Sequence, residues 1–201
     1  QGKAPILVET LRAMVAALAP DTMIGRRDRA LLLLGFAGAF RRSELVSLDV
    51  SDIEETDDGL VVHLRRSKTD QEGAGRKVGI PYGSDPATCP VRALRAWLET
   101  SGIAAGPLFR PINRHGQVGN RRLSDKAVAL VVKRAAEAAG YDPSRFSGHS
   151  LRAGLATAAA AAGKSERAIM EQTGHKSAAM VRRYIRDGSL FRDNAASGIG
   201  L

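Results

Sequence analysis

The spacing of apolar residues changes twice along this chain, and that double change most constrains its fold. Apolar residues recur with helical spacing through the first fifty residues, change to short strand-like runs between residues 50 and 81, and return to helical spacing from Pro90 onward. We therefore expect an α+β protein that is mostly helical, with a small three-stranded antiparallel sheet inserted early in the sequence.

The sequence also gives approximate bounds for these elements. Helices are expected at residues 8–18, 26–39, 43–48, 90–100, 124–139, 149–162, 165–172 and 178–186. Strands are expected at 50–53, 59–64 and 76–81, joined by polar, glycine-containing connections at 54–58 and 65–75. The segment 102–122 is rich in Gly, Pro and Arg, which is typical of a surface connection.

Net charge favours a polyanionic partner. Thirty Lys and Arg residues stand against 21 Asp and Glu, which leaves a formal charge of +9. We expect nucleic acid before membrane, because no basic amphipathic anchor and no apolar run of membrane-spanning length is present. A solvated basic surface with no such partner is the alternative. The single cysteine, Cys89, excludes an internal disulfide and fits a reducing compartment.

Two features that could indicate a nucleotide site and a metal site lack the sequence context that such sites require. Gly163-Lys164-Ser165 resembles the end of a phosphate-binding P-loop, but Ala158 stands where the first glycine is required and the preceding residues are alanines. Those alanines favour a helix that packs closely on its neighbours. The four histidines lack a short metal-ligand spacing. We therefore expect no nucleotide and no metal cofactor.

His149 and Arg152 lie three residues apart at the expected start of a helix. Residues with this spacing share a face, so an imidazole and a guanidinium would point to one place. Ser147 or Ser150 could cap the helix, where free backbone N–H groups favour an anion. A surface His and Arg on an alanine-rich helix is the alternative reading.

Arg41-Arg42-Ser43-Glu44 follows directly on an apolar helix. An arginine at the end of a buried helix is costly unless it is paired, and Glu44 is the available partner of Arg41. One reading is a purely structural ion pair at the helix junction. The other has Glu44 orient Arg41 toward an external phosphate, since the planar guanidinium can hold two oxygens.

Three further side chains complete the set of candidates. Lys68 lies in the expected turn between two strands and is either a solvated lysine or a proton donor carried on a hairpin. Tyr184 shares a helical stripe with Met180 but is surrounded by arginines, so it is either a core tyrosine or a phosphate neighbour. His175 lies at a break between two short helices and either joins them or binds a phosphate.

The order Arg-x-Ser-Glu-Leu, hairpin lysine, His-x-x-Arg, Gly-His and late tyrosine resembles the catalytic domain of the tyrosine recombinase (phage integrase) family over nearly the whole chain. The resemblance implies catalytic roles for Arg41, Lys68, His149, Arg152, His175 and the nucleophile Tyr184, with Glu44 as support for Arg41. Lys77 borders the same hairpin as an alternative to Lys68. Ala39-Phe40 departs from the Gly-Leu that the family usually has there.

This resemblance implies a site-specific recombinase that cuts and rejoins double-stranded DNA through a 3′-phosphotyrosyl intermediate, without ATP, metal or other cofactor. It implies a bacterial cytoplasmic protein, with four protomers on paired DNA sites and a monomer when the domain is alone. The tail at 187–201 is expected to dock on a neighbouring protomer, or to cap its own domain. Residues 1–201 are expected to form the catalytic domain of a longer protein whose N-terminal domain clamps the DNA.

Two other functions remain open from the sequence. A type IB topoisomerase shares the tyrosine attack but relaxes supercoils instead of exchanging strands. A non-catalytic DNA-binding module would use the same cationic cluster only to hold phosphates. Formation of a covalent protein–DNA adduct would separate catalysis from binding alone.

Overall fold

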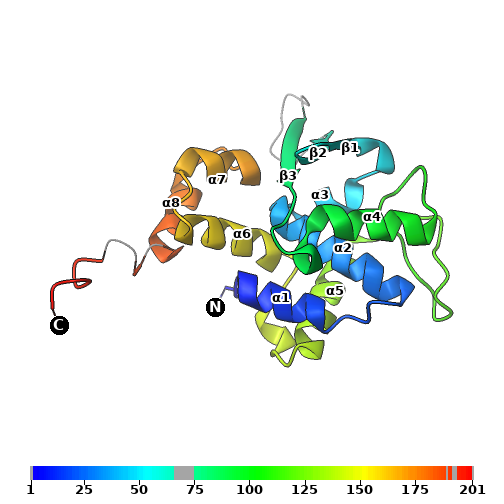
Figure 1. Cartoon of the computed structure of the whole chain (residues 1–201), viewed down its shortest axis with the longest axis horizontal. Coiled ribbons are helices and arrows are strands. Elements are labelled where there is room, and N and C mark those ends of the chain that lie inside the picture. The colour runs from blue at the N-terminus through cyan, green and yellow to red at the C-terminus, as the bar shows by residue number, and fades with distance from the viewer. Residues whose placement is uncertain (1, 66–74, 189, 192–193, 201) are drawn as a thin grey trace.

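The computed structural model describes residues 2–65, 75–188, 190–191 and 194–200 of the chain. Within these residues the expected α+β fold is confirmed, with a helical body and a small sheet at one edge (Figure 1). The α-helices are α1 Val8–Ala16, α2 Met23–Ala37, α3 Arg42–Ser47, α4 Pro90–Ser101, α5 Asp125–Ala138, α6 Ser150–Ala161, α7 Glu166–Thr173 and α8 Ala178–Gly188. The strands are β1 Ile53–Thr56, β2 Gly59–Leu64 and β3 Arg76–Pro81.

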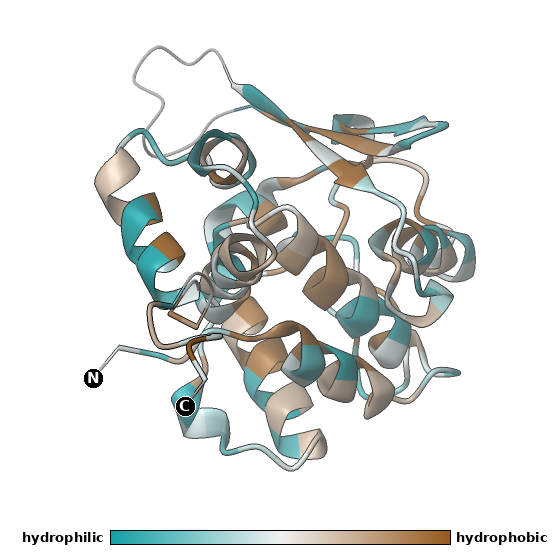
Figure 2. Ribbon diagram, turned by 60° about the vertical axis from the view of Figure 1, so that its left-hand side comes forward, coloured by the Kyte–Doolittle hydropathy of each residue, from teal (hydrophilic) through white to brown (hydrophobic). Residues whose placement is uncertain are grey.

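The sheet is antiparallel in the order β1-β2-β3. Val62 on β2 lies opposite Val78 on β3, and Leu60 lies opposite Ile80. All four side chains are buried, as expected when alternate residues of a strand face the core. The sheet therefore covers the helical body with one apolar face, and Figure 2 shows the hydrophobic stretches of the strands in brown.

The prediction of a strand at residues 50–53 is wrong. Val50–Asp52 forms a 3₁₀ turn, which closes when the carboxylate of Asp52 accepts a hydrogen bond from the backbone N–H of Asp49 at 2.8 Å. β1 begins only at Ile53 and runs through residues predicted to be a connection, and Thr56 pairs with Gly59 across a two-residue turn. β1 is an edge strand with exposed glutamates, so it lacks the apolar alternation that sequence analysis detects.

The segment 102–122 is more than a surface connection. Leu108 and Phe109 are fully buried, and the backbone N–H of Leu108 donates to the carbonyl oxygen of Leu48 at 2.9 Å. The indole of Trp97 on α4 donates to the carbonyl oxygen of Leu108 at 2.9 Å. This loop is therefore part of the main core, which α2 crosses with a run of buried leucines ending at Leu34.

A second, smaller core joins α6, α7 and α8. Its buried members are Ala156, Ala160, Ile169 and Val181, and Tyr184 packs against it. The alanines of α6 allow α8 to approach closely, as expected from the sequence. Together α7 and α8 lie beside α6 at one end of the molecule, and the C-terminal tail runs away from the body there (Figure 1). Tyr184 is thus carried by the part of the fold with the smaller apolar core.

Candidate active site

Arg41 is positioned by the junction between α2 and α3. Its backbone N–H donates to Oε2 of Glu44 at 3.0 Å, and its Nη1 donates to Oε1 of the same carboxylate at 2.7 Å. Glu44 is buried and Arg41 is partly exposed. The predicted contact between the two residues is confirmed, and it fixes the arginine at the start of α3 while leaving its Nη2 without a hydrogen bond to this carboxylate.

Arg152 lies on the first turn of α6 and is 1% exposed, which is unusual for a charged side chain. Its Nη1 donates to the carbonyl oxygen of Ala39 at 3.0 Å and also to the carbonyl oxygen of Thr173. Its Nη2 is buried and has no hydrogen-bond partner among the residues that the structure describes. A buried donor without an acceptor is costly, so an external acceptor such as a water molecule or a ligand oxygen would stabilise this atom.

His149 precedes α6 instead of starting it, one residue from the predicted bound. Its backbone N–H donates to Oγ of Ser147 at 3.2 Å, and Oγ of Ser150 accepts from the backbone N–H of Ser147 at 2.9 Å. Both serines thus shape the turn that leads into α6. His149 is exposed to solvent, and its imidazole interacts electrostatically with Arg152.

His175 follows Gly174, which ends α7 in a left-handed conformation at φ +69°. Nδ1 of His175 lies 2.7 Å from Oγ1 of the buried Thr173. The ring centroid of His175 lies 6.3 Å from that of Tyr184 on α8. The break between the two helices therefore brings the histidine and the tyrosine to one place.

Arg76, at the start of β3, is a site residue that sequence analysis missed. It donates to the carbonyl oxygens of Gln172 at 3.2 Å and Thr173 at 3.4 Å, and its Nη2 lies 3.8 Å from Oε2 of Glu44. These carbonyls belong to the C-terminal end of α7, where a cation is favoured. An arginine at the start of a strand belongs to no sequence motif or spacing that predicts a role in a site.

Lys68 lies outside the described residues, so its assignment stays a prediction. Lys77, the alternative, is exposed on β3 and lies opposite His63 of β2. The other five predicted residues come together: Arg152 interacts electrostatically with Arg41 and Tyr184, and His175 interacts with Arg152, Arg41 and His149. Residues far apart in the sequence thus form one cationic cluster.

The cluster shifts the pKa values of its members. Burial, followed by the charge of Arg41, lowers the pKa of Arg152 to about 10. Burial, followed by the charges of Arg152 and Arg41, lowers the pKa of His175 to about 4. The pKa of His149 is lowered for the same reasons, burial first and then the neighbouring arginines. Both histidines are therefore neutral at pH 7 and can accept a proton.

The balance of charge within the cluster is positive. The guanidinium groups of Arg41, Arg76 and Arg152 surround the carboxylate of Glu44, and each interacts with it. In the described part of the chain, no group of three or more His, Cys, Asp and Glu side chains could hold a metal ion. Nor is any described helix long and apolar enough to cross a membrane. The arrangement can stabilise an oxyanion with fixed donors.

A small antiparallel sheet on a helical body, with arginines, histidines and a tyrosine gathered where α6, α7 and α8 meet, is the architecture of tyrosine recombinase catalytic domains. The sequence model of the phage integrase family matches residues 6–189. The chain belongs to the phage integrase family.

Curated relatives agree with this assignment. The chain is 49% identical to an integrase/recombinase XerD homologue of Selenomonas ruminantium, over 97% of this chain and 57% of the relative. It is 34% identical to a tyrosine recombinase of Synechococcus elongatus, over 88% of this chain and 52% of the relative. The chain thus spans about half the length of the curated relatives it matches.

Solved structures share the fold. The XerH recombinase bound to its palindromic difH substrate, in a post-cleavage complex, aligns with a TM-score of 0.71 and 19% identity, covering 96% of this chain and 51% of that one. The XerA recombinase aligns with a TM-score of 0.69 and 19% identity, covering 92% and 61%. At this level of identity the likeness establishes the fold.

Proposed function

We propose that this chain is the catalytic domain of a site-specific DNA recombinase that cuts and rejoins strands through a 3′-phosphotyrosyl link. The observation that carries the proposal is the buried Nη2 of Arg152, which finds no acceptor among the described residues. A phosphodiester supplies the oxygens and the negative charge that this cluster needs. Relatives named as recombinases support the same activity.

Burial makes the cluster of arginines energetically unfavourable in the absence of an anion. A guanidinium that is 1% exposed and stands beside two further arginines is costly, because burial and like charge both disfavour its cationic form. The carboxylate of Glu44 offsets only part of this charge. A DNA phosphate that enters the cluster would hydrogen-bond to Nη2 and reduce the repulsion between Arg41 and Arg152. The free protein is therefore arranged in advance for an anion.

In the proposed reaction the phenol oxygen of Tyr184 attacks the phosphorus of a DNA phosphodiester. A bond forms between the tyrosine oxygen and phosphorus, and the bond from phosphorus to the 5′ oxygen breaks. Arg41 and Arg152 stabilise the charge that develops on the non-bridging oxygens, which is commonly the largest single contribution to such catalysis. The chain itself thus supplies the nucleophile and the charge stabilisation.

Two proton transfers accompany the attack. The phenol must lose its proton, since its ordinary pKa of about 10 keeps it protonated at pH 7. A neutral histidine can accept that proton, and the sequence predicts His149 in this role. The departing 5′ oxygen must gain a proton, and the sequence predicts Lys68 as its donor. Because the phosphotyrosyl bond conserves the energy of the original bond, attack by a 5′ hydroxyl reverses the step without ATP.

The test is covalent capture. The full chain is incubated with a pool of duplexes randomised around a single nick, so that the short strand released by attack diffuses away and the adduct accumulates. We expect a covalent protein–DNA band on denaturing gels, and Tyr184→Phe should abolish it while DNA retention on filters is unchanged. Retention of DNA by both proteins with no adduct from either would reject catalysis in favour of a binding module.

The topoisomerase alternative predicts a different outcome with plasmid DNA. Relaxation of supercoils that needs no paired sites would favour a type IB activity. Strand exchange between two captured sites favours recombination. DNA affinity should in either case fall steeply with salt, because contacts to phosphates release counterions.

We propose double-stranded DNA as the partner and the bacterial cytoplasm as the place of action. Proteins of similar fold have been solved bound to DNA, such as a lambda integrase dimer on a core site. We also propose that a DNA-clamping domain accompanies this one in the working enzyme, with four protomers on two paired sites.

The tail supports this assembly. Leu190, Phe191 and Ile199 are exposed, with Phe191 at 85%, and they pack on no core in the described part of the chain. The alternative, in which the tail caps its own domain, is not favoured by these exposures. We propose that the tail docks on a neighbouring protomer, since an exposed apolar segment that meets a pocket elsewhere on an identical chain makes a heterologous contact, which closes into a ring when the rotation between protomers allows it.

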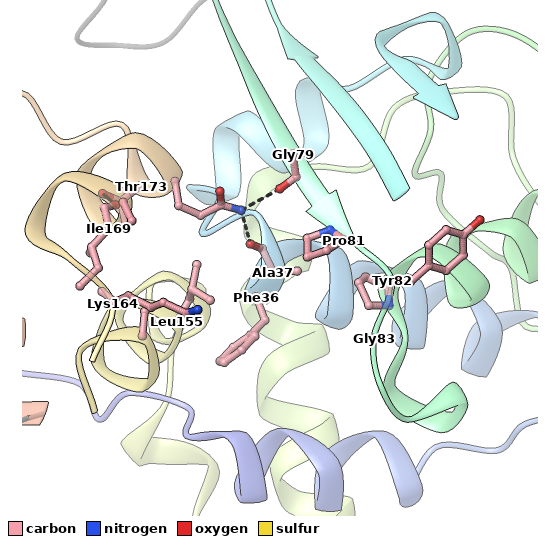
Figure 3. A pocket seen from close by; sticks show the side chains of 15 residues that line it. Phe36, Ala37, Gly79, Pro81, Tyr82, Gly83, Leu155, Lys164, Ile169 and Thr173 are labelled. Atoms are coloured by element: carbon pink, nitrogen blue, oxygen red, sulfur yellow. Dashed lines mark hydrogen bonds between the residues drawn. The ribbon is translucent and has the colours of Figure 1, made fainter. Parts of the chain in front are cut away.

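An apolar pocket of about 410 Å³ offers a receptor for this tail. Figure 3 shows it between β3 and the helices α6 and α7, with Phe36, Leu155 and Ile169 on its walls and Pro81 and Tyr82 at one side. The side chain of Gln172 bridges its rim, donating to the carbonyl oxygens of Ala37 at 2.7 Å and Gly79 at 3.0 Å.

Two variants test the docking. Truncation after Gly188 removes the tail, and Ala168→Glu places a charge at an exposed position of the pocket wall. We expect each change to reduce assembly on DNA, measured by sedimentation, while the circular dichroism of the free chain stays the same. Assembly that is unchanged by both would contradict docking of the tail.

A further inference from the structure

Thr173 uses its carbonyl oxygen and its hydroxyl to hold residues of the proposed active site. It is the last residue of α7 and is completely buried. Its carbonyl oxygen accepts hydrogen bonds from Nη1 of Arg152 and from Nη2 of Arg76, the latter at 3.4 Å. Its hydroxyl lies 2.7 Å from Nδ1 of His175. One residue thus contacts two arginines and a histidine of the cluster.

The direction of the hydrogen bond between Thr173 and His175 follows from a count of protons. A threonine hydroxyl has one proton to donate. Oγ1 of Thr173 donates that proton to the carbonyl oxygen of Ile169 at 2.8 Å, one helical turn earlier. The same oxygen can then only accept from His175, and its position near the backbone N–H of His175, at 3.4 Å, agrees with an acceptor role. Nδ1 of His175 therefore carries the ring proton.

We propose that Thr173 is a positioning residue that holds His175 in its Nδ1–H tautomer, so that Nε2 of His175 accepts the phenol proton of Tyr184. The proposal rests on the proposed function and assigns the proton acceptor within it. His175 takes this role in place of His149, because the rings of His175 and Tyr184 are neighbours, with their centroids 6.3 Å apart. A hydrogen-bond partner on one ring nitrogen that selects the tautomer of a catalytic histidine is a general feature of such sites.

The surroundings keep the ring neutral until a substrate enters. Cationic or titratable groups approach His175 from the α2–α3 junction, from β3, from α6 and the turn before it, and from α8, namely Arg41, Arg76, Arg152, His149 and Tyr184. The arginines disfavour a charged imidazole, so Nε2 keeps its lone pair in the free protein. A bound phosphate adds negative charge to the cluster and makes protonation of His175 easier.

The proton transfer then completes a donor set for the phosphate. The O–H bond of Tyr184 breaks, an N–H bond forms at Nε2 of His175, and the phenolate oxygen attacks phosphorus. The resulting imidazolium has two N–H groups. One stays on Oγ1 of Thr173 and the other can donate to a phosphate oxygen, where a charged donor binds more strongly than a neutral one. In the reverse reaction the same proton returns to the tyrosine.

Nitrogen NMR on the full chain with ¹⁵N-labelled histidine tests the tautomer directly. At pH 7 we expect His175 to show a protonated Nδ1 and an unprotonated Nε2. Thr173→Ser keeps the hydroxyl and should keep that pattern, whereas Thr173→Val keeps the size of the side chain, removes the acceptor and should shift the ring toward Nε2–H. A protonated Nε2 in the wild type, or a Val variant with an unchanged pattern, would overturn the proposal.

Single-turnover adduct formation tests the consequence. Thr173→Val should slow adduct formation about 10- to 100-fold, the usual cost of losing such a partner, and Thr173→Ser should restore most of it. His175→Gln should slow adduct formation more than His149→Gln does, and the opposite order would assign the proton to His149. If no protein forms an adduct, the proposed function fails. The NMR result still decides the tautomer in that case.

Discussion

The carbonyl oxygen of Ala39 accepts a hydrogen bond from Nη1 of Arg152 at 3.0 Å, although 113 residues separate the two in the chain. Ala39 adopts φ +49°, a left-handed conformation that is unfavourable for any residue with a Cβ. It is the only non-glycine residue of the described chain with a positive φ of this kind. The backbone after α2 is therefore strained at the position where it holds the buried arginine.

This strain predicts that Ala39→Gly is tolerated. Glycine removes a penalty of roughly 1–2 kcal/mol for the left-handed conformation, and it adds an unfolded-state entropy cost of roughly 0.5–1 kcal/mol. We expect the free energy of unfolding in urea to stay the same or to rise slightly. Ala96→Gly within α4 is the control and should lower it by about 1 kcal/mol. An equal loss in both variants would contradict the strain at Ala39.

Replacing Arg152 with lysine should separate binding from chemistry. A lysine ammonium can still donate to one of the carbonyls of Ala39 and Thr173, but it lacks the fork that leaves Nη2 free for a phosphate oxygen. We expect the adduct rate to fall about 10²- to 10³-fold, the range seen when one donor to a developing oxyanion is removed. Arg42→Lys, at an exposed neighbouring position, is the matched control. Equal rates for both variants would argue against a direct contact of Arg152 with the phosphate.

Glu44 is expected to be required for the fold as well as for the site. It is buried and binds Arg41 through both its carboxylate oxygens, so Glu44→Gln leaves buried guanidinium charge without its counter-charge. We expect the free energy of unfolding to fall by about 3 kcal/mol, as when one partner of a buried pair is removed. Glu54→Gln breaks an exposed contact with His63 and should cost less than about 1 kcal/mol. Chemical denaturation of the two variants checks this difference.

Stability should depend on pH through His175. Its folded pKa of about 4 lies below the ordinary value near 6.5, so the unfolded chain binds more protons between these limits. The free energy of unfolding should therefore be unaffected by this group above pH 6.5 and should fall as the pH drops toward 4. The His175→Gln variant should show a shallower fall over that window. Identical slopes for the two proteins would contradict a depressed pKa.

Much of the site could be predicted because its residues stand at local landmarks. Glu44 lies three residues after Arg41 and His149 three before Arg152, and this spacing across the start of a helix brings the two residues of each pair together without knowledge of the fold. Gly174 ends a helix, as a glycine after a helical segment commonly does, so this helix end can be predicted from the sequence. The order of these motifs along the chain then indicated one family and one tyrosine.

The remainder depends on contacts between distant segments. Arg76 joins the site only because β3 lies beside the end of α7, and β1 is a strand only because β2 supplies its partner. Leu108 and Phe109 are buried inside a segment whose composition is that of a loop. The hydroxyl of Thr173 acquires its role only when helix α7 directs it to Ile169 and His175 at once. No local spacing encodes such relationships.

Gly174 is predicted to be irreplaceable for a reason beyond its backbone conformation. Gly174 and Gly102 both end helices, at φ +69° and +68°, so alanine carries the same conformational penalty of roughly 1–2 kcal/mol at each position. Around Gly102 an added Cβ meets no atom within 4 Å, whereas at Gly174 it would lie 2.7 Å from Cζ of Arg76. Gly102→Ala therefore measures the conformational cost alone.

The guanidinium of Arg76 can move away from that Cβ only by giving up its hydrogen bonds to the carbonyls of Gln172 and Thr173. We expect Gly174→Ala to destabilise the chain by more than Gly102→Ala, and to slow adduct formation at least tenfold because the segment that carries His175 shifts. Gly102→Ala should leave the adduct rate unchanged. Denaturation and single-turnover assays on the two variants give both comparisons. Equal losses of stability and of adduct rate in Gly174→Ala and Gly102→Ala would show that the side chain of Arg76 moves away without cost and does not hold the end of α7.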